Sequence, residues 1–284
     1  MLRTNRDQVV KISVQGEISA PIYSNPGKLD SEGRIFVLPG TGGITYNVKI
    51  GDPACGFECD HVEPGVSTKN YDEMKNNAYN YLSCIGNEAT IITGDGKGAK
   101  GFVTGTHGGI EHVIMYFDPA ILDTLNIGDK VNVKAYGQGL KLLDYPEITV
   151  KNLDPDLLDK LNIEEKSGKL IVPVAKKVPA KIMGSGLGSN TTNKGDYDIC
   201  LFDDATVAEY GLRDLRLGDI VLLEDCDNTH GRNYLSGACT IGVVVHSDCR
   251  IMGHGPGVTT LLTSKRPLIE GKIDPKANLA DILL

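Results

Sequence analysis

The chain has 284 residues, a formal net charge of -8 at pH 7 and a sequence pI near 5.3. This acidic balance argues against nucleic acid or an anionic membrane surface as a partner, because both require a basic face. A chain of this length buries about 75% of its unfolded surface, so its stability requires neither a disulfide nor a metal. Any bound metal would therefore serve function.

Two further features concern location and composition. No apolar run approaches the ~20 residues of a membrane helix, and the N-terminus lacks a charged-then-apolar leader. The 7 cysteines have irregular spacings without a CxxC pair, which is typical of a reducing compartment. We therefore expect a cytoplasmic protein that contacts no membrane. With 34 glycines, no tryptophan and few aromatics, it should be a turn-rich β protein.

In the N-terminal part, residues 9–14, 34–38 and 45–50 are expected to form short strands. The polar segment 67–83 suggests an exposed loop or an irregular helix. Alternating runs from about 87 to 136 predict a small barrel. Residues 92–103 of that region contain the spacing GxxKGxxGxV, which resembles the KOW motif of SH3-like barrels in ribosomal and transcription proteins. A plain barrel turn is the alternative to RNA binding, and the lack of stacking aromatics favours the turn.

Three Asp-Pro segments, 118–127, 154–163 and 274–283, predict short helices, because Asp is a good N-cap and Pro suits the first helical position. A boundary near Asp154 would divide an N-terminal domain, 1–153, from a C-terminal β-rich domain, 154–284. Pro173 and Pro179 favour edge or bulged strands. The sequence thus indicates an α+β, mostly β fold, with barrel-like and sandwich-like β parts and a few short helices.

Two turns that lie far apart in the chain have similar sequences. His61 precedes Pro-Gly-Val-Ser, and His254 precedes Pro-Gly-Val-Thr after a short spacer. His246 follows an apolar run and lies two residues before Asp248, so a continuing strand would place both on one face. We expect His61, His246, Asp248 and His254 to converge on one catalytic site, with the three imidazoles as candidate metal ligands. The alternative is that these turns only close strand connections, since no HExxH spacing is present.

Two other groups of residues could carry chemistry. Asp227 and His230 crowd together after a strand and are candidate ligands of a divalent cation, although a solvated turn explains them more simply. Cys249, close in sequence to two histidines, is a candidate nucleophile, because a thiol requires a nearby base to lower its pKa. Most free cysteines are instead small buried apolar residues.

The phrases GGITYNVKIGD, CDHVEPGVS, SCIGNEA, KGFVTGTHGG, GQGLKLLD, IGVVVHSDC and GHGPGV occur together in this chain. In this combination the sequence resembles, over its full length, a bacterial family of unassigned activity, domain of unknown function 4438. The resemblance implies a mostly β protein and supplies no reaction. A weaker likeness, to acetamidase and formamidase proteins, lies in Gly-Asp strand entries and His-bearing Pro-Gly turns. It is an analogy of fold alone.

From these features we expect an enzyme that acts on a small polar molecule, by metal-assisted or histidine-dependent hydrolysis of an amide-like bond. A divalent metal ion is the candidate cofactor, and a homo-oligomer is the expected assembly. The alternative is a non-catalytic, oligomeric binding or assembly module. In that case the histidines should be exposed singly, or buried without carboxylate partners. RNA binding through the KOW-like barrel is a third alternative.

Overall fold

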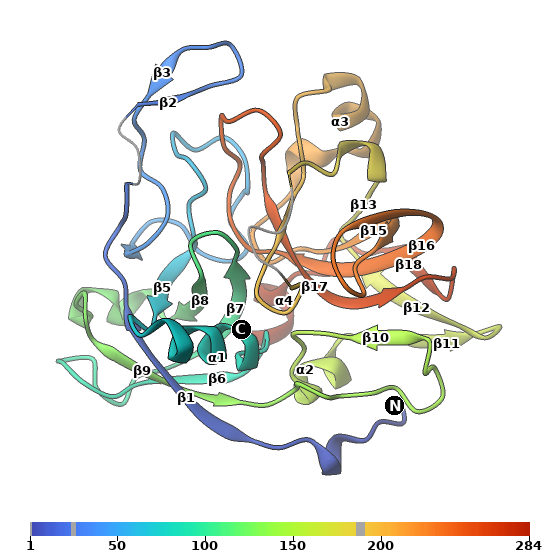
Figure 1. Ribbon diagram of the computed structural model, residues 1–284, viewed down its shortest axis with the longest axis horizontal. Helices are drawn as coiled ribbons and strands as arrows, with labels where there is room; N and C mark the ends of the chain where they lie inside the picture. Colours follow the sequence, from blue (N-terminus) through green and yellow to red (C-terminus); the bar gives the residue numbers. More distant parts are fainter. Residues whose placement is uncertain (1, 24–26, 186–190) are drawn as a thin grey trace.

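The computed structural model describes residues 2–23, 27–185 and 191–284, and they form a mostly β fold with a few short helices (Figure 1). The strands are β1 (Ile12–Ile18), β2 (Lys28–Leu29), β3 (Ile35–Phe36), β4 (Ile44–Thr45), β5 (Gly65–Lys69), β6 (Glu88–Ile91), β7 (Lys100–His107), β8 (His112–Phe117), β9 (Lys130–Ala135), β10 (Ile148–Val150), β11 (Glu164–Lys166), β12 (Lys169–Val174), β13 (Lys176–Val178), β14 (Tyr197–Asp198), β15 (Ile220–Asp227), β16 (Asn233–Val244), β17 (Gly257–Ser264) and β18 (Ile269–Ile273). The α-helices are α1 (Glu73–Leu82), α2 (Pro155–Lys160), α3 (Asp204–Tyr210) and α4 (Leu279–Leu283), and the 3-10 helices are η1 (Arg6–Gln8), η2 (Pro119–Thr124), η3 (Ala180–Ile182) and η4 (Leu212–Asp214).

The N-terminal part is a closed barrel. Its sheet has the order β1-β9-β6-β7-β8-β5-β4, and the additional pairing of β1 with β5 closes the ring. Alternate residues of β9, such as Val131 and Val133, point into the barrel core. The barrel is therefore larger than the expected 87–136 segment, because β1 and β5 come from outside it. Gly94 and Gly98 of the KOW-like spacing fall in the β6–β7 turn, whereas Gly101 lies in β7. Gly94 has a φ of 69° and leaves room for Asp129.

The C-terminal part contains two sheets. A six-stranded sheet has the order β10-β17-β16-β15-β13, with β14 paired to β17, and a three-stranded sheet has the order β11-β12-β18. Most pairs are antiparallel, but β12–β18 and β13–β15 are parallel. The strand β14 places Tyr197 opposite Val258 and Asp198 opposite Gly257. This short pairing brings two aspartates to the start of β17.

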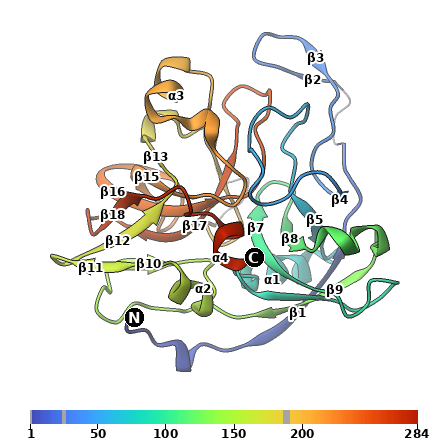
Figure 2. The same ribbon diagram turned by 180° about the vertical axis from the view of Figure 1, so that it is seen from behind.

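The barrel and the C-terminal sheets share one apolar core. Ile85 and Ile114 of the first part lie in the same buried cluster as Val172 and Leu262 of the second. Helix α4 lies between the two parts (Figures 1 and 2), where Leu279 belongs to this cluster. Strand β7 also lies against β17, since the hydroxyl of Thr259 donates to the carbonyl of Thr106 at 3.1 Å. The end of β7 therefore approaches the start of β17.

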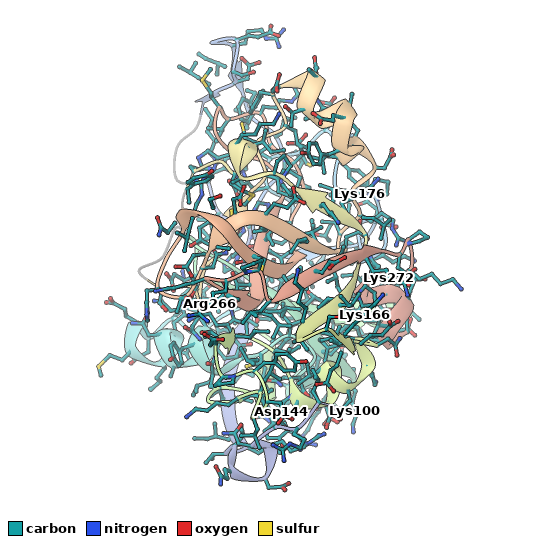
Figure 3. The ribbon with its side chains drawn as sticks, turned by 90° about the vertical axis from the view of Figure 1, so that its right-hand side faces the viewer. Lys100, Asp144, Lys166, Lys176, Arg266 and Lys272 are labelled. Carbon is teal, nitrogen blue, oxygen red and sulfur yellow. The ribbon has the colours of Figure 1, made fainter. Side chains whose placement is uncertain are left out.

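The surface is lined with paired charges, several of which are labelled in Figure 3. Lys272 lies 3.2 Å from Glu164, and Arg266 lies 2.8 Å from Glu147. Each exposed pair of this kind stabilises a protein by at most about 1 kcal/mol. The stability of the fold therefore rests on its buried apolar clusters.

The predicted helices formed with altered bounds. The side chains of Asp118 and Asp154 cap η2 and α2 as expected, whereas the third Asp-Pro segment becomes helical only at Leu279, after an Asn278 cap. The segment 67–83 contains a regular helix, α1, because its Tyr79 is buried against the barrel and bonds Thr68. No helix within the described residues is long and apolar enough to cross a membrane.

Two of the predicted strands are shorter than expected. Residues 45–50 form turns beyond Thr45, and residues 34–38 contribute only β3. Val48 and Ile50 are buried, whereas Ile35 and Val37 are exposed. The apolar pattern was therefore a guide to burial in 45–50 and not in 34–38.

Candidate functional site

Five of the six histidines gather where the barrel meets the C-terminal sheet. His61 lies on the loop before β5, and His107 ends β7. His246 and His254 lie on the connection from β16 to β17. The ring centroid of His246 is 5.1 Å from that of His61 and 4.3 Å from that of His107. The centroid of His254 is 5.2 Å from that of His61.

The two distant loops meet through backbone pairing. The N–H of Ser247 donates to the carbonyl of Val62 at 2.9 Å, and the N–H of Val62 donates to the hydroxyl of Ser247 at 2.8 Å. His61 has a φ of 57°, in the left-handed region that non-glycine residues rarely adopt. Such backbone strain persists only where the surroundings enforce it, and it occurs often at functional sites. The surrounding structure thus holds His61 in a strained backbone conformation that sets the direction of its ring.

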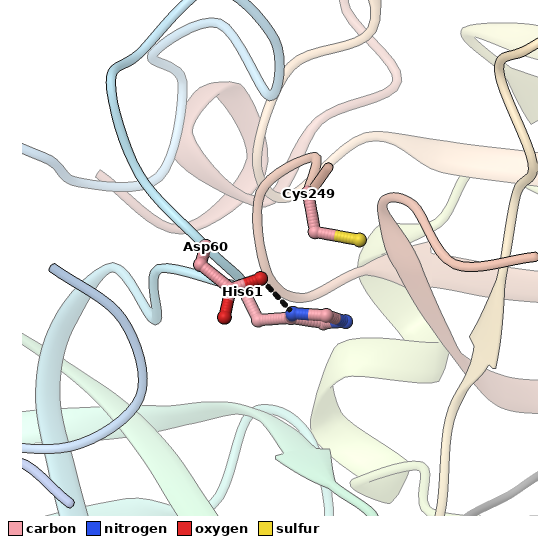
Figure 4. A group of neighbouring side chains, drawn as sticks. All are labelled: Asp60, His61 and Cys249. Atoms are coloured by element: carbon pink, nitrogen blue, oxygen red, sulfur yellow. Dashed lines mark hydrogen bonds and ion pairs between the residues drawn. The ribbon is translucent and has the colours of Figure 1, made fainter. Parts of the chain in front are cut away.

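Asp60 orients His61. Nδ1 of His61 donates to Oδ1 of Asp60 at 2.8 Å, a contact drawn in Figure 4, and Lys28 Nζ lies 2.6 Å from the other carboxylate oxygen. Burial tends to raise the pKa of Asp60, but the hydrogen bonds from His61 and Lys28 outweigh it and lower that pKa to about 2. Asp60 therefore stays ionised and holds Nδ1 of His61 protonated. Nε2 of His61 is left to face the interior of the site.

His246 has no exposed side-chain surface, and its contacts define its tautomer. Nδ1 lies 2.9 Å from the carbonyl oxygen of Ser247, which can only accept, so Nδ1 must carry a proton. Nε2 lies 2.7 Å from Oδ2 of Asp196 and 3.4 Å from Oδ1 of Asp198. A neutral His246 would thus direct a lone pair at two carboxylates. A proton or a cation must lie among these atoms.

His254 lies at the rim, with 37% of its side chain exposed. Nδ1 lies 2.8 Å from Oδ2 of Asp198, and Nε2 lies 3.1 Å from the hydroxyl of Ser185. Nε2 of His61 also approaches the same Nδ1, at 3.3 Å. Ser185 can accept the Nε2 proton of His254, which leaves the Nδ1 lone pair directed inward.

Glu63 anchors His107 from the barrel side. Oε1 of Glu63 accepts from Nδ1 of His107 at 2.6 Å, and Oε2 accepts from Nδ1 of His112 at 2.9 Å and from the Gly42 N–H at 2.9 Å. Burial tends to raise the pKa of Glu63, but the two imidazoles lower it well below its ordinary value. Since Nδ1 of His107 is occupied, its Nε2 is the nitrogen left to face Asp196 and His246.

One arrangement is common to all four inner imidazoles. Each has an outer nitrogen next to an acceptor and an inner nitrogen next to Asp196 or Asp198. The acceptors are Asp60 for His61, Glu63 for His107, the Ser247 carbonyl for His246 and Ser185 for His254. Metal-ligating histidines almost always donate their second N–H in this way, to a carboxylate, a carbonyl or another acceptor. This arrangement fits a metal centre.

The inner atoms form two groups with ligand spacing. One consists of His61, Asp198 and His254, and the other of His107, Asp196 and His246. Within each group the ligand atoms lie within 4.8 Å of one another. Asp60, His61 and Cys249 also lie within that distance, but Asp60 occupies the outer nitrogen of His61. The first two groups are therefore the candidate ligand sets.

The electrostatics of the site follow from its buried carboxylates. Burial disfavours the charged imidazole, yet hydrogen bonds to Asp198 and Asp60 raise the pKa of His61 to about 12. Asp196 and Asp198 likewise overcome burial and raise the pKa of His246 to about 10. Burial tends to raise the pKa of Asp198, but its three imidazole neighbours hold it well below the ordinary value. The carboxylates thus attract positive charge into the site.

Asp248 and Cys249 lie beside these groups. Strand β16 ends at Val244, so His246 and Asp248 do not share a strand face, and the expectation that they pair was wrong. Asp248 accepts from the Cys249 N–H at 2.8 Å and lies 3.8 Å from Arg213. Cys249 is buried next to His61 (Figure 4), and burial raises its thiol pKa despite that imidazole. A protonated thiol is a weak nucleophile.

Asp227 and His230 lie outside the site. The carboxylate of Asp227 accepts from the N–H and hydroxyl of Thr229 in its own turn, at 3.0 and 2.6 Å, and His230 is exposed. Among the described residues neither belongs to a group of three ligands. Asp227 is buried in this turn while His230 is exposed, and we do not extend the metal hypothesis to these two residues.

Four residues of the site were not singled out from the sequence: Glu63, His107, Asp196 and Asp198. Asp196 and Asp198 form an Asp-x-Asp pair, and this period-two spacing places both carboxylates on one face of an extended segment. Glu63 follows His61 at the same spacing. These two patterns were the available signals. His107 has no comparable local signal.

The fold and site thus describe a mostly β chain with a buried cluster of histidines and carboxylates. The chain belongs to the family described as domain of unknown function (DUF4438), whose N-terminal model matches residues 28–159 and whose C-terminal model matches residues 160–283. A solved structure described as "Crystal structure of TM1086" is 48% identical, covers 100% of this chain and 99% of its own, and superposes with a TM-score of 0.95. No curated protein matches.

Proposed function

We propose that the protein is a metal-dependent hydrolase that acts on a small polar molecule carrying an amide-like bond. The observation that supports this most is the common arrangement of His61, His107, His246 and His254. Each imidazole has its outer nitrogen next to an acceptor, so its inner nitrogen can face the carboxylates of Asp196 and Asp198.

The burial of these groups supports an enzyme over a binding module. A non-catalytic module would leave its histidines exposed singly, or buried without carboxylates. Here the side chains of His61 and His107 are 9% exposed and that of His246 is 0% exposed, and each has a carboxylate partner. Burying so many ionisable groups costs stability, and such groups are typical of functional sites.

Each residue has a role in this proposal. A divalent ion bound here would lower the pKa of a bound water to about 7 and polarise a substrate carbonyl. The inner nitrogens and the carboxylates of Asp196 and Asp198 would be the metal ligands, while Asp60, Glu63 and Ser185 fix the tautomers. His254, the most exposed of the four, marks the side from which a substrate would enter. We assign no ligand role to Asp248 and Cys249.

The proposal is tested by elemental analysis and by activity. The purified protein should contain a stoichiometric divalent metal and release ammonia from at least one member of a panel of small primary amides. A chelator should abolish the release, and the added metal should restore it. His254→Ala should lower both metal content and activity, whereas His230→Ala, at the exposed histidine outside the site, should change neither. A metal-free wild type, or hydrolysis that survives chelation, would reject the proposal.

A cytoplasmic location is part of the same proposal. All seven cysteines are free, and five of them are buried. Thiols persist in this form in a reducing compartment, which supports the cytoplasm.

A further inference from the structure

We infer that the site binds two divalent ions, bridged by the carboxylate of Asp198. The inference rests on the proposed function, since it concerns the same residues, and it specifies how many ions they hold and which residues hold each. One ion would lie among His61, Asp198 and His254. The second would lie among His107, Asp196 and His246, with the second oxygen of Asp198 completing its ligands.

The first argument is the spacing of the donor atoms. Bonds to an ion such as Zn²⁺ are ~2.0–2.2 Å long, so two ligands on opposite sides of one ion are at most about 4.4 Å apart. Each set of three, with its atoms within 4.8 Å of one another, is close to this limit. The six donors do not form a single group within that distance; they divide into two. One ion cannot reach all of them.

The second argument is the orientation of Asp198. Its Oδ2 lies 2.8 Å from Nδ1 of His254 and 3.8 Å from Nε2 of His61, whereas its Oδ1 lies 3.4 Å from Nε2 of His246. The two oxygens of one carboxylate therefore face the two sets. A carboxylate in this position can bridge ions ~3.5–4 Å apart, which is the usual separation in two-metal hydrolytic centres.

The third argument is the space kept beside the second set. A Cβ at Gly257 would collide with Oδ2 of Asp196 and with Nε2 of His246. Gly257 begins β17 opposite Asp198, and its backbone has no positive φ that would by itself require glycine. The absence of a side chain there keeps the position next to these two buried atoms free of a Cβ. A side chain at this position would therefore block the donor atoms of the second set.

Each set also has its own supporting acceptors. Asp60 and Ser185 hold His61 and His254, whereas Glu63 and the Ser247 carbonyl hold His107 and His246. The Gly108 N–H donates to Oδ1 of Asp196 at 2.6 Å and fixes that carboxylate. Since the two sets share only Asp198, a change in one set should leave the other able to bind.

The test is the Mn²⁺ content of the full-length protein, with electron paramagnetic resonance as a second readout. Wild type loaded with Mn²⁺ and dialysed should retain about two ions per chain, with a spin-coupled signal. Asp196→Asn should remove the second ion and His254→Ala the first, each leaving about one ion and an uncoupled signal. Asp227→Asn, at a buried aspartate outside the site, should retain both.

The outcomes separate this inference from the proposed function. A wild type with one ion per chain and no coupling overturns the two-ion centre, even where amide hydrolysis is intact. Loss of all metal from both single variants, when each still melts as metal-free wild type does, also overturns it, since it indicates one shared ion. Two coupled ions without hydrolysis of any amide support the centre and contradict the proposed reaction. A metal-free wild type overturns both.

Discussion

Nδ1 of His107 lies 2.6 Å from Oε1 of Glu63, a carboxylate whose side chain is entirely buried. The same carboxylate bonds His112, so it fixes two imidazoles at the barrel end. Substitution Glu63→Gln removes the anion and offers only one acceptor oxygen to the two rings. We expect metal affinity to fall by about 10- to 100-fold, the effect typical of losing an outer partner of a ligating histidine.

A competition titration against a chromophoric chelator measures this affinity. Glu58→Gln, at an exposed glutamate that pairs with Arg250, is the matched control and should bind metal as wild type does. An unchanged affinity in Glu63→Gln would remove Glu63 from the site.

Gly257→Ala tests the space beside His246. The added methyl group would collide with Asp196 and His246, and overpacking of this kind typically costs about 1–3 kcal/mol in the free energy of unfolding. Urea denaturation measures that cost, and metal analysis should show a lower content. In the double variant Gly257→Ala/Asp196→Ala the collision partner is shortened, so part of the stability should return. A strictly additive double variant would disprove the steric explanation.

Metal binding should stabilise the fold. A ligand that binds only the native state, at a free concentration of ~100 times its Kd, adds about 2.7 kcal/mol, which corresponds to a rise of several degrees in Tm. Differential scanning fluorimetry with Mn²⁺ or Zn²⁺ measures the shift. The rise should be reduced in His61→Ala and retained in His230→Ala. Equal shifts in both variants would place the binding elsewhere.

The carboxyl of Asp154, distant in sequence from the candidate ligands, predicts a pH effect on stability. Burial raises its pKa above the ordinary value, despite hydrogen bonds from the Asp156 N–H and Asn87. The folded state therefore binds this proton more tightly than the unfolded state. The stabilisation is fully present below the unfolded pKa and is lost as pH rises through the folded pKa.

The stability of wild type relative to Asp154→Asn should therefore decrease as the pH rises above about 4, the ordinary pKa of an aspartate. Urea denaturation at several pH values measures the difference. Asp95→Asn, at an exposed aspartate, is the control and should show no such trend. A difference that grows with pH would contradict the assigned shift.

The sequence allowed part of the site to be predicted. The repeated Pro-Gly-Val sequence pointed to His61 and His254. The apolar run before His246 predicted that His246 lies at the end of a strand. The structure brings these three rings together. The pairing of His246 with Asp248 failed because β16 ends two residues before His246. Asp196 and Asp198, and not Asp248, are the carboxylates next to His246. Their position depends on the pairing of β14 with β17, which no local sequence pattern specifies.

The fold was predictable to a similar extent. Alternating residues correctly indicated barrel strands such as β9, and Asp-Pro pairs indicated η2 and α2. Closure of the barrel by β1 and β5 depends on partners far apart in the chain, Glu17 and Lys69. The periodicity of apolar residues indicates which face of a strand is buried, but it does not indicate which other strand pairs with it.

The division of the ligands between the two family models has a consequence for any shortened form of the protein. His61, Glu63 and His107 lie in the region of the first model, and Asp196, Asp198, His246 and His254 lie in that of the second. A polypeptide cut between residues 159 and 160 would yield two pieces, each with an incomplete coordination sphere. Only their reassociation could recreate the centre, so co-expressed halves would report on folding and on metal capture in a single assay.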